Sequence, residues 1–267
     1  MGSAAHELDD LRQAADRAVF QVVSDLVVTS ADSPTSGSES ARLIVVVPGQ
    51  PGEYDAAGPV SFASFGRDVE VAALTAALVE GQQPNREMPT PLMVARYLAS
   101  RDLDDNPEHS ETWASARWIT TSGADAKALG EHLRTDGTRV ALILVADGAA
   151  CHGPKAPRAQ DSRAQAYDDG VCSALASGQP GRLAQLDVDL GVELGATGSQ
   201  VWPVLIAAAA GDGLGSAGLA ATEGSAGSAG SAGSLGLAGY TPWDGEVLWA
   251  GSPYGVGWTV ARWCRPE

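Results

Sequence analysis

Four side chains that could take part in chemistry lie within one span of nine residues. They are the carboxylate of Asp147, the thiol of Cys151, the imidazole of His152 and the amine of Lys155. An imidazole and a carboxylate are suited to proton transfer, and a neighbouring amine favours an anionic or phenolic ligand. We therefore predict His152 and Asp147 as catalytic residues and Lys155 and Cys151 as ligand-binding residues. The alternative is that Asp147 caps a turn and that His152 and Lys155 are solvated.

The apolar patterns around this loop predict where it lies in a fold. Residues 140–145 are a continuous apolar run that ends just before Asp147, and residues 43–47 form a similar run. Such runs are typical of strands buried on both faces of a parallel sheet, and open α/β sheets bind ligands at the carboxyl ends of their strands. The Gly- and Pro-rich turn 252–257 allows close backbone approach. We place the ligand site between the loop 147–157 and this turn, with Tyr254 as a further ligand-binding residue.

Helical and strand patterns alternate along the rest of the chain. Together they predict an α/β layered fold with a central mixed or mostly parallel sheet flanked by helices, in a single domain over 1–267. A Gly/Ser/Ala-rich stretch at 211–239 is expected to be a flexible surface insertion. It contains a GxGxxG match that lacks the preceding strand of a dinucleotide site. The predicted helices are 4–26, 68–80, 90–101, 124–134 and several within 161–210, and the further strands are 113–121, 246–250 and 255–263.

Charge and composition narrow the classes of partner. The 267-residue chain has a formal net charge of −16 and only 17 basic residues, which argues against nucleic acid and anionic membrane surfaces. It has no apolar stretch of the roughly 18 to 20 residues that a membrane span needs and no basic, then apolar, leader. The three cysteines lack metal or disulfide spacing. We expect a soluble, cytoplasmic protein with a small-molecule partner, and homo-oligomer formation stays open.

The other histidines give weaker signals. His6 and His132 lie in predicted helices with charged or mixed surfaces, and His109 lies in a polar loop between Glu108 and Glu111. We predict all three histidines to be surface residues. The alternative for His109 is a divalent-metal site with the two flanking carboxylates.

The order of several segments along the second half of the chain is similar to that of a known family. The segments are the strand 139–146 with its loop 147–157, Tyr167-Asp168-Asp169, the turn 177–183, Trp202-Pro203-Val204-Leu205 and the ending 252–258. This order resembles the subunit-B-like domain of class III extradiol ring-cleavage dioxygenases, especially divergent actinobacterial members. The resemblance implies Fe(II) held by two histidines and one glutamate, and a further histidine as acid/base in aromatic ring opening.

The chain departs from that family at the positions of its histidines. It opens on a predicted helix where the family has its first strand and metal ligand, and residues 48–65 contain no histidine. Ala150 stands where the acid/base histidine belongs, with His152 two residues further on, and the metal ligands stay unknown. Two interpretations remain open: an extradiol dioxygenase-type oxidoreductase with His152 as acid/base, or a family member without metal that serves as a small-molecule-binding or partner subunit. A third, a hydrolase or transferase using Cys151 and His152, requires adjacent loop residues to reach one substrate atom.

Overall fold

A computed structural model describes most of the chain. The described residues are 8–31, 41–55, 58–63, 70–71, 74, 88–136, 138–210 and 243–265. The insertion predicted at 211–239 and His6 lie outside them, as does most of the helix predicted at 68–80. The assignment of one domain over the whole chain stays a prediction.

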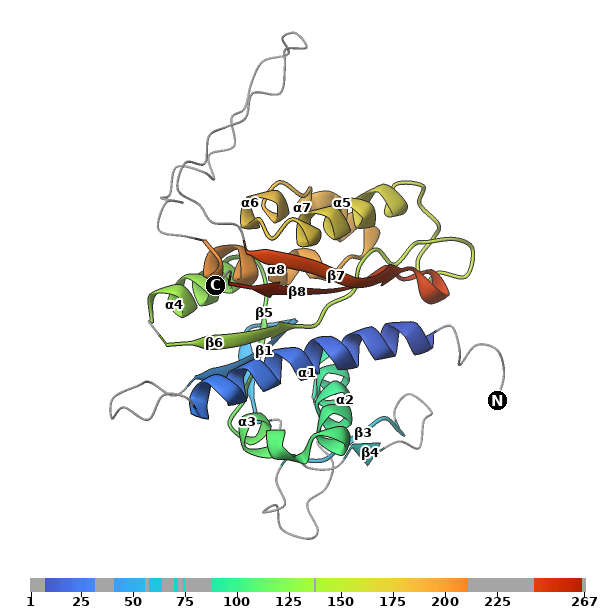
Figure 1. The fold of residues 1–267 in the computed structure, drawn as a ribbon. Coiled ribbons are helices and arrows are strands. Elements are labelled where there is room, and N and C mark those ends of the chain that lie inside the picture. The colour runs from blue at the N-terminus through green and yellow to red at the C-terminus, as the bar shows by residue number, and fades with distance from the viewer. Residues whose placement is uncertain are drawn as a thin grey trace.

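A four-stranded sheet forms the centre of the structure (Figure 1). Its order is β2 (Gly52–Tyr54), β5 (Arg117–Thr121), β1 (Arg42–Pro48) and β6 (Val140–Leu144). Strand β1 pairs in parallel with both β5 and β6, and β2 runs antiparallel to β5. The predicted α/β class with a mixed sheet is therefore confirmed.

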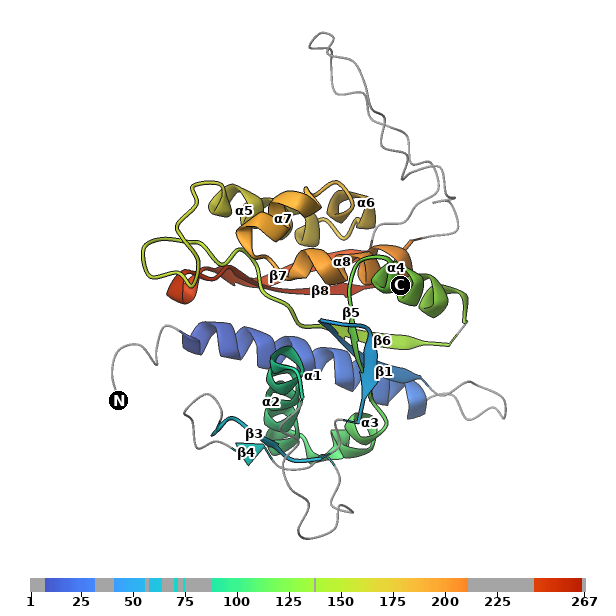
Figure 2. The same cartoon turned by 180° about the vertical axis from the view of Figure 1, so that it is seen from behind.

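Helices cover both faces of this sheet because its central strand is apolar on both sides. Leu43, Val45 and Val47 of β1 pack with apolar residues of α1 (Asp9–Ala31) and α2 (Thr90–Asp105). The alternate residues Ile44 and Val46 pack with α4 (Gly123–Thr135) and α8 (Gly198–Ala208). The two-residue period of a strand divides the run between two cores. Figure 2 shows the two helical layers on opposite sides of β1, β5 and β6.

A second unit of structure extends the molecule beyond β6. Strands β7 (Asp244–Gly251) and β8 (Trp258–Cys264) form an antiparallel hairpin joined by the short helix η5 (Pro253–Gly255). The hairpin contacts α1 and also α5 (Ala164–Ala176), so that it lies between two helices (Figure 1). The short helices α6 (Pro180–Leu183) and α7 (Val188–Leu194) complete the apolar cluster around α5.

Two sequence-based assignments of secondary structure are wrong. Trp113, predicted in a strand, lies in α3 (Ser110–Ala114), which follows η3 (Pro107–His109), and β5 starts only at Arg117. The Trp113 ring stacks on Trp118 with ring centroids 5.8 Å apart, so tertiary packing outweighs the strand preference of an aromatic residue. Within the helix predicted at 68–80, β4 (Glu70–Val71) pairs with β3 (Val60–Ser61) as a short antiparallel ribbon.

The length and hydropathy of the helices also bear on membranes. Within the part of the chain that the structure describes, no helix is both long enough and apolar enough to cross a bilayer.

Candidate functional site

The loop after β6 and the segment before β8 lie against each other. The backbone N–H of Gly148 donates to the carbonyl of Gly257 over 2.9 Å, and the Gly257 N–H donates to Ala149 over 2.8 Å. Further along, the His152 N–H donates to the carbonyl of Gly255 over 3.0 Å. The structure therefore brings together the two segments, 147–157 and 252–257, between which the sequence placed a ligand site.

His152 is held by a carboxylate from another element. Its Nε2 lies 2.6 Å from Oδ2 of Asp168 on α5, and the two side chains are 9% and 15% exposed. Asp168 also accepts a hydrogen bond of 3.1 Å from the Ala149 N–H. An ionised carboxylate only accepts hydrogen bonds, so Nε2 carries the hydrogen and Nδ1 is the ring nitrogen left to accept a proton.

Two glycines make room for the Asp168 carboxylate. A Cβ at Gly257 would lie 1.8 Å from Asp168 Oδ2, and one at Gly148 would lie 2.9 Å from Oδ1. Distances this short cannot be tolerated without displacing the carboxylate. The glycines thus allow the carboxylate to sit against the two backbone segments, and this fixes the direction from which it meets His152.

Asp147, predicted to act with His152, is instead anchored to α8 by its backbone. Its N–H donates to Thr197 Oγ1 over 2.8 Å, and its carbonyl accepts from the Gly198 N–H over 2.9 Å. Its carboxylate makes no hydrogen bond to the residues that the structure describes, and burial raises its pKa above the ordinary aspartate value. The carboxylate that partners His152 is thus Asp168, not Asp147.

The predicted ligand-binding residues fall in different environments. Cys151 is 2% exposed in the apolar cluster around α5, where its Sγ lies 3.5 Å from the carbonyl of Leu194, and burial raises its pKa. Lys155 is exposed in a turn. Tyr254 is also exposed and has a φ of 55°, a left-handed conformation that is uncommon for residues other than glycine. Lys155 and Tyr254 can meet a ligand from solvent, whereas the Cys151 thiol lies in the core.

The prediction that His109 is a surface residue is wrong. His109 is buried, and its Nδ1 lies 2.8 Å from Oδ2 of Asp102 on α2, with side-chain exposures of 3% and 1%. Oδ2 of Asp102 also accepts from the indole N–H of Trp113 over 2.7 Å, and Oδ1 accepts from Asn106 over 3.2 Å. The helical spacing of residues 102, 106, 109 and 113 is the sequence signal for this network, although the chain leaves helical geometry at Asn106 and the residues come from α2, η3 and α3.

A serine also joins this buried network, so that a serine, a histidine and an aspartate follow one another as they do in a catalytic triad. Ser24 Oγ lies 3.2 Å from His109 Nε2. A triad also needs backbone donors aimed at the oxyanion beside its nucleophile. Ser24 lies well inside the 23-residue helix α1, where the backbone N–H groups are used by the helix itself. We interpret Ser24, His109 and Asp102 as a structural link between α1, α2 and η3.

Asp168 is the functional candidate that sequence reasoning left unassigned. It falls at a core-facing position of α5, four residues after Ala164 and three before Val171, both of which are buried. A carboxylate on the apolar face of a helix needs a partner. The position of Asp168 on the apolar face of α5 is therefore the sequence signal that could have identified it as a functional candidate. Its distance along the chain from His152 carries no such signal.

The Fe(II) implied by the resemblance needs three protein ligands. Among the residues described, no three His, Cys, Asp or Glu side chains gather into a metal-binding group, and the site itself supplies His152 and Asp168. The described residues do not fit a facial triad. No protein-family model matches the chain, and no curated protein matches it either.

Proposed function

We propose that the protein binds a small phenolic molecule beside the loop 147–157 and that His152 accepts the phenolic proton. The observation that carries the proposal is the 2.6 Å pair between His152, in the loop that follows β6, and Asp168 on α5. Loops that leave the carboxyl ends of strands are where open α/β sheets bind their ligands. The proposal corresponds to the small-molecule-binding interpretation of the sequence.

The proposal gives each group a role in that proton transfer. His152 Nδ1 accepts the proton, and the imidazolium that forms is stabilised by Asp168 through Nε2. The phenolate is then paired with the imidazolium, and Lys155 adds a second positive charge from the exposed turn. The resemblance supports this role, since the family places its acid/base histidine in the corresponding loop.

A chromogenic phenol tests the proposal directly. We expect 4-nitrophenol, added at a pH where the free compound is mostly protonated, to develop phenolate absorbance on binding the wild-type protein. His152→Gln should abolish this signal and Lys155→Gln should reduce it. His132→Gln is the matched control because His132 is exposed on α4. Equal signals from the wild type and His152→Gln would overturn the proposal.

Dioxygenase activity is the second candidate, supported by the family resemblance and by the position of His152. It is measured as oxygen uptake with catechol after Fe(II) is added to the protein. We expect no uptake above that of iron alone, because the described part of the site offers two donor side chains. Uptake that depends on His152 would restore the enzyme interpretation.

A further inference from the structure

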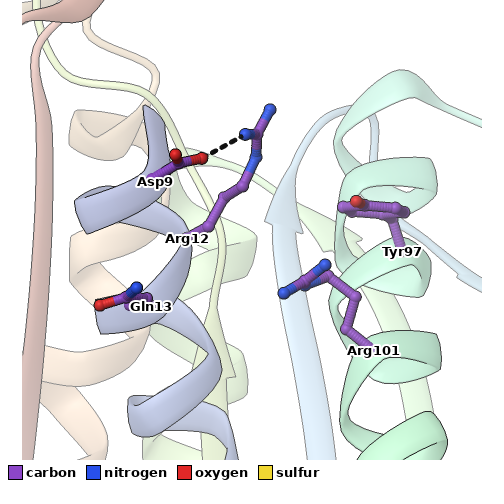
Figure 3. Close-up of a pocket in the computed structure, with 5 residues that line it drawn as sticks. All are labelled: Asp9, Arg12, Gln13, Tyr97 and Arg101. Atoms are coloured by element: carbon purple, nitrogen blue, oxygen red, sulfur yellow. Dashed lines mark hydrogen bonds and ion pairs between the residues drawn. The ribbon is translucent and has the colours of Figure 1, made fainter. Parts of the chain in front are cut away.

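The pocket between α1 and α2 contains arginines whose charges are balanced by carboxylates. Its volume is about 350 Å³, and it is lined by Asp9, Arg12, Gln13, Tyr97 and Arg101 (Figure 3). Arg12 pairs with Asp9 at 3.2 Å, and Arg101 pairs with Asp16 at 2.5 Å. The pocket therefore offers no surplus charge to a ligand, and we assign no site to it.

Arg158, in the loop that holds His152, has partners of another kind. Its Nη1 donates to the backbone carbonyls of Val192 over 3.2 Å and of Glu193 over 2.9 Å. Both carbonyls lie in the last turn of α7, where carbonyl groups need partners from outside the helix. Arg158 therefore caps the end of α7, although 34 residues separate it from Val192 in the sequence.

The loop is joined to α7 at a second point. The N–H of Ala150 donates to the carbonyl of Leu194 over 2.9 Å, and the N–H of Arg158 donates to the carbonyl of Ala150 over 3.0 Å. Residues 150–158 thus form a closed loop whose two ends contact each other and α7. Because His152 lies inside this closed loop, the anchor at Arg158 bears on where its ring is held.

The backbone at Gly195 makes room for the Arg158 side chain. Gly195 has a φ of 75°, in the left-handed region that glycine adopts readily. A Cβ at this position would lie 2.7 Å from both Cδ and Nη1 of Arg158. The absence of a side chain at Gly195 therefore allows the arginine stem to lie across the end of α7 and its guanidinium to reach the two carbonyls.

We propose that Arg158 is a positioning residue, which holds His152 at the Asp168 carboxylate by fixing the loop 150–158 on α7. The proposal rests on the proposed function, in which His152 accepts the phenolic proton. Residues 150–158 contain no helix or strand, so the shape of the loop depends on its anchors. When only a fraction of molecules hold a binding group in place, the apparent affinity falls in proportion to that fraction.

The first measurement needs no ligand and follows the ring N–H proton that His152 donates to Asp168. Proton NMR detects such a proton, and His152→Gln assigns its signal. We expect Arg158→Met, which keeps a long side chain but has no donor, to speed the exchange of this proton with solvent about fivefold, because exchange reports local opening. The ring proton between His109 and Asp102 is the control in the same spectrum, and its exchange should be unchanged.

The second measurement is the titration with 4-nitrophenol. Arg158→Met should weaken binding about fivefold, whereas Arg158→Lys keeps a cationic donor and should retain most of the affinity. Arg163→Met is the matched control for loss of charge. Arg163 also reaches α7, but through the exposed side chain of Glu193 at 3.0 Å, so this variant should bind as the wild type does.

The two measurements separate this proposal from the proposed function. Faster exchange of the His152 proton in Arg158→Met, with an unchanged His109 proton, supports the positioning role even if 4-nitrophenol gives no signal with the wild type. An unchanged His152 proton would overturn it, as would faster exchange with full affinity in a protein that binds 4-nitrophenol. Equal effects of Arg158→Met and Arg163→Met would also overturn it, because loss of charge would then explain both. Circular dichroism of each variant shows that a lost signal is not a lost fold.

Discussion

Two histidine–aspartate pairs lie in the described part of the chain, and their surroundings differ. At His109, both ring nitrogens have hydrogen-bond partners, Asp102 Oδ2 and Ser24 Oγ, and the side chains of the His–Asp pair are at most 3% exposed. At His152, the pair is 9% and 15% exposed and lies where two loops meet. The first pair is enclosed by α1, α2, η3 and α3, whereas the second keeps a ring nitrogen for another group.

The difference shows that residue types alone do not distinguish a site from a core network. A buried polar network whose hydrogen bonds are all made rigidifies a fold, and proton transfer needs a group with capacity left to accept or donate. The region around His152 also holds features that cost stability, namely the left-handed Tyr254 and the partly buried carboxylate of Asp147. Such features persist where function requires them. The comparison therefore supports a structural role for the first pair and a functional role for the second.

The largest effect is expected at the buried pair. Asp102→Ala removes the acceptor of three side-chain donors, and breaking a buried pair typically costs about 3–5 kcal/mol in the free energy of unfolding. Urea denaturation measures this loss, with the exposed neighbour on α2, Asp104→Ala, as control. The response to 4-nitrophenol per folded molecule should be unchanged. A loss below about 1 kcal/mol would contradict the structural interpretation.

Asp168→Asn should reverse that pattern. The stability cost is expected to be smaller, about 1.5–3 kcal/mol, the range for a hydrogen bond to a charged group. The phenolate signal should fall about tenfold, equivalent to about 1.4 kcal/mol, because the imidazolium loses its partner. Asp168 is a positioning residue, so the decisive reading is a shifted pH profile of phenolate absorbance. Asp169→Asn, on the exposed side of α5, should leave that profile unchanged.

Glycine variants separate the geometry of the second pair from its charges. Gly257→Ala places a methyl group against Asp168 Oδ2 and should lower the free energy of unfolding by about 1–3 kcal/mol through overpacking. It should also weaken the absorbance response to 4-nitrophenol. Gly181→Ala on α6 meets no atom within 4 Å and should be neutral or stabilising by up to about 1 kcal/mol. Equal thermal stabilities of the two variants would show that the close approach at Gly257 is not required.

Tyr254 tests whether strain in the second region is retained for binding. A left-handed non-glycine residue costs about 1–2 kcal/mol, and the added backbone entropy of glycine offsets about half of that. Tyr254→Gly should therefore raise the free energy of unfolding by about 0.5–1 kcal/mol and weaken phenol binding. A stabilised variant with full binding would remove Tyr254 from the ligand site.

The two regions also differ in how far the sequence predicted them. The apolar runs at β1 and β6 predicted the strands, and the loop after β6 was placed at their carboxyl ends because parallel strands share that edge. The pairing of His152 with Asp168 was not predicted, since it depends on how α5 packs against the hairpin β7–β8. His109 was misassigned because charged neighbours hide its burial. Spacing along α5 shows that Asp168 lies on the same face as Ala164 and Val171, but for both pairs only the packing of separate elements shows which side chains meet.

The smallest effect is expected at Asp147 and is measured as the pH dependence of thermal stability. Burial raises the pKa of Asp147 in the folded state, so the ionised carboxylate opposes folding at neutral pH. Asp147→Asn should therefore melt at a higher temperature than the wild type at pH 7. The difference should shrink as pH falls through the raised pKa and vanish below the ordinary aspartate value of about 3.9.

Asp136 provides a control of opposite sign, since its hydrogen bond with Thr138 lowers its pKa. Asp136→Asn should be less stable than the wild type at pH 7, and that deficit should disappear in acid. If Asp147→Asn instead loses stability at neutral pH, its carboxylate has a stabilising partner, and the second region then resembles the first in how its polar groups are satisfied.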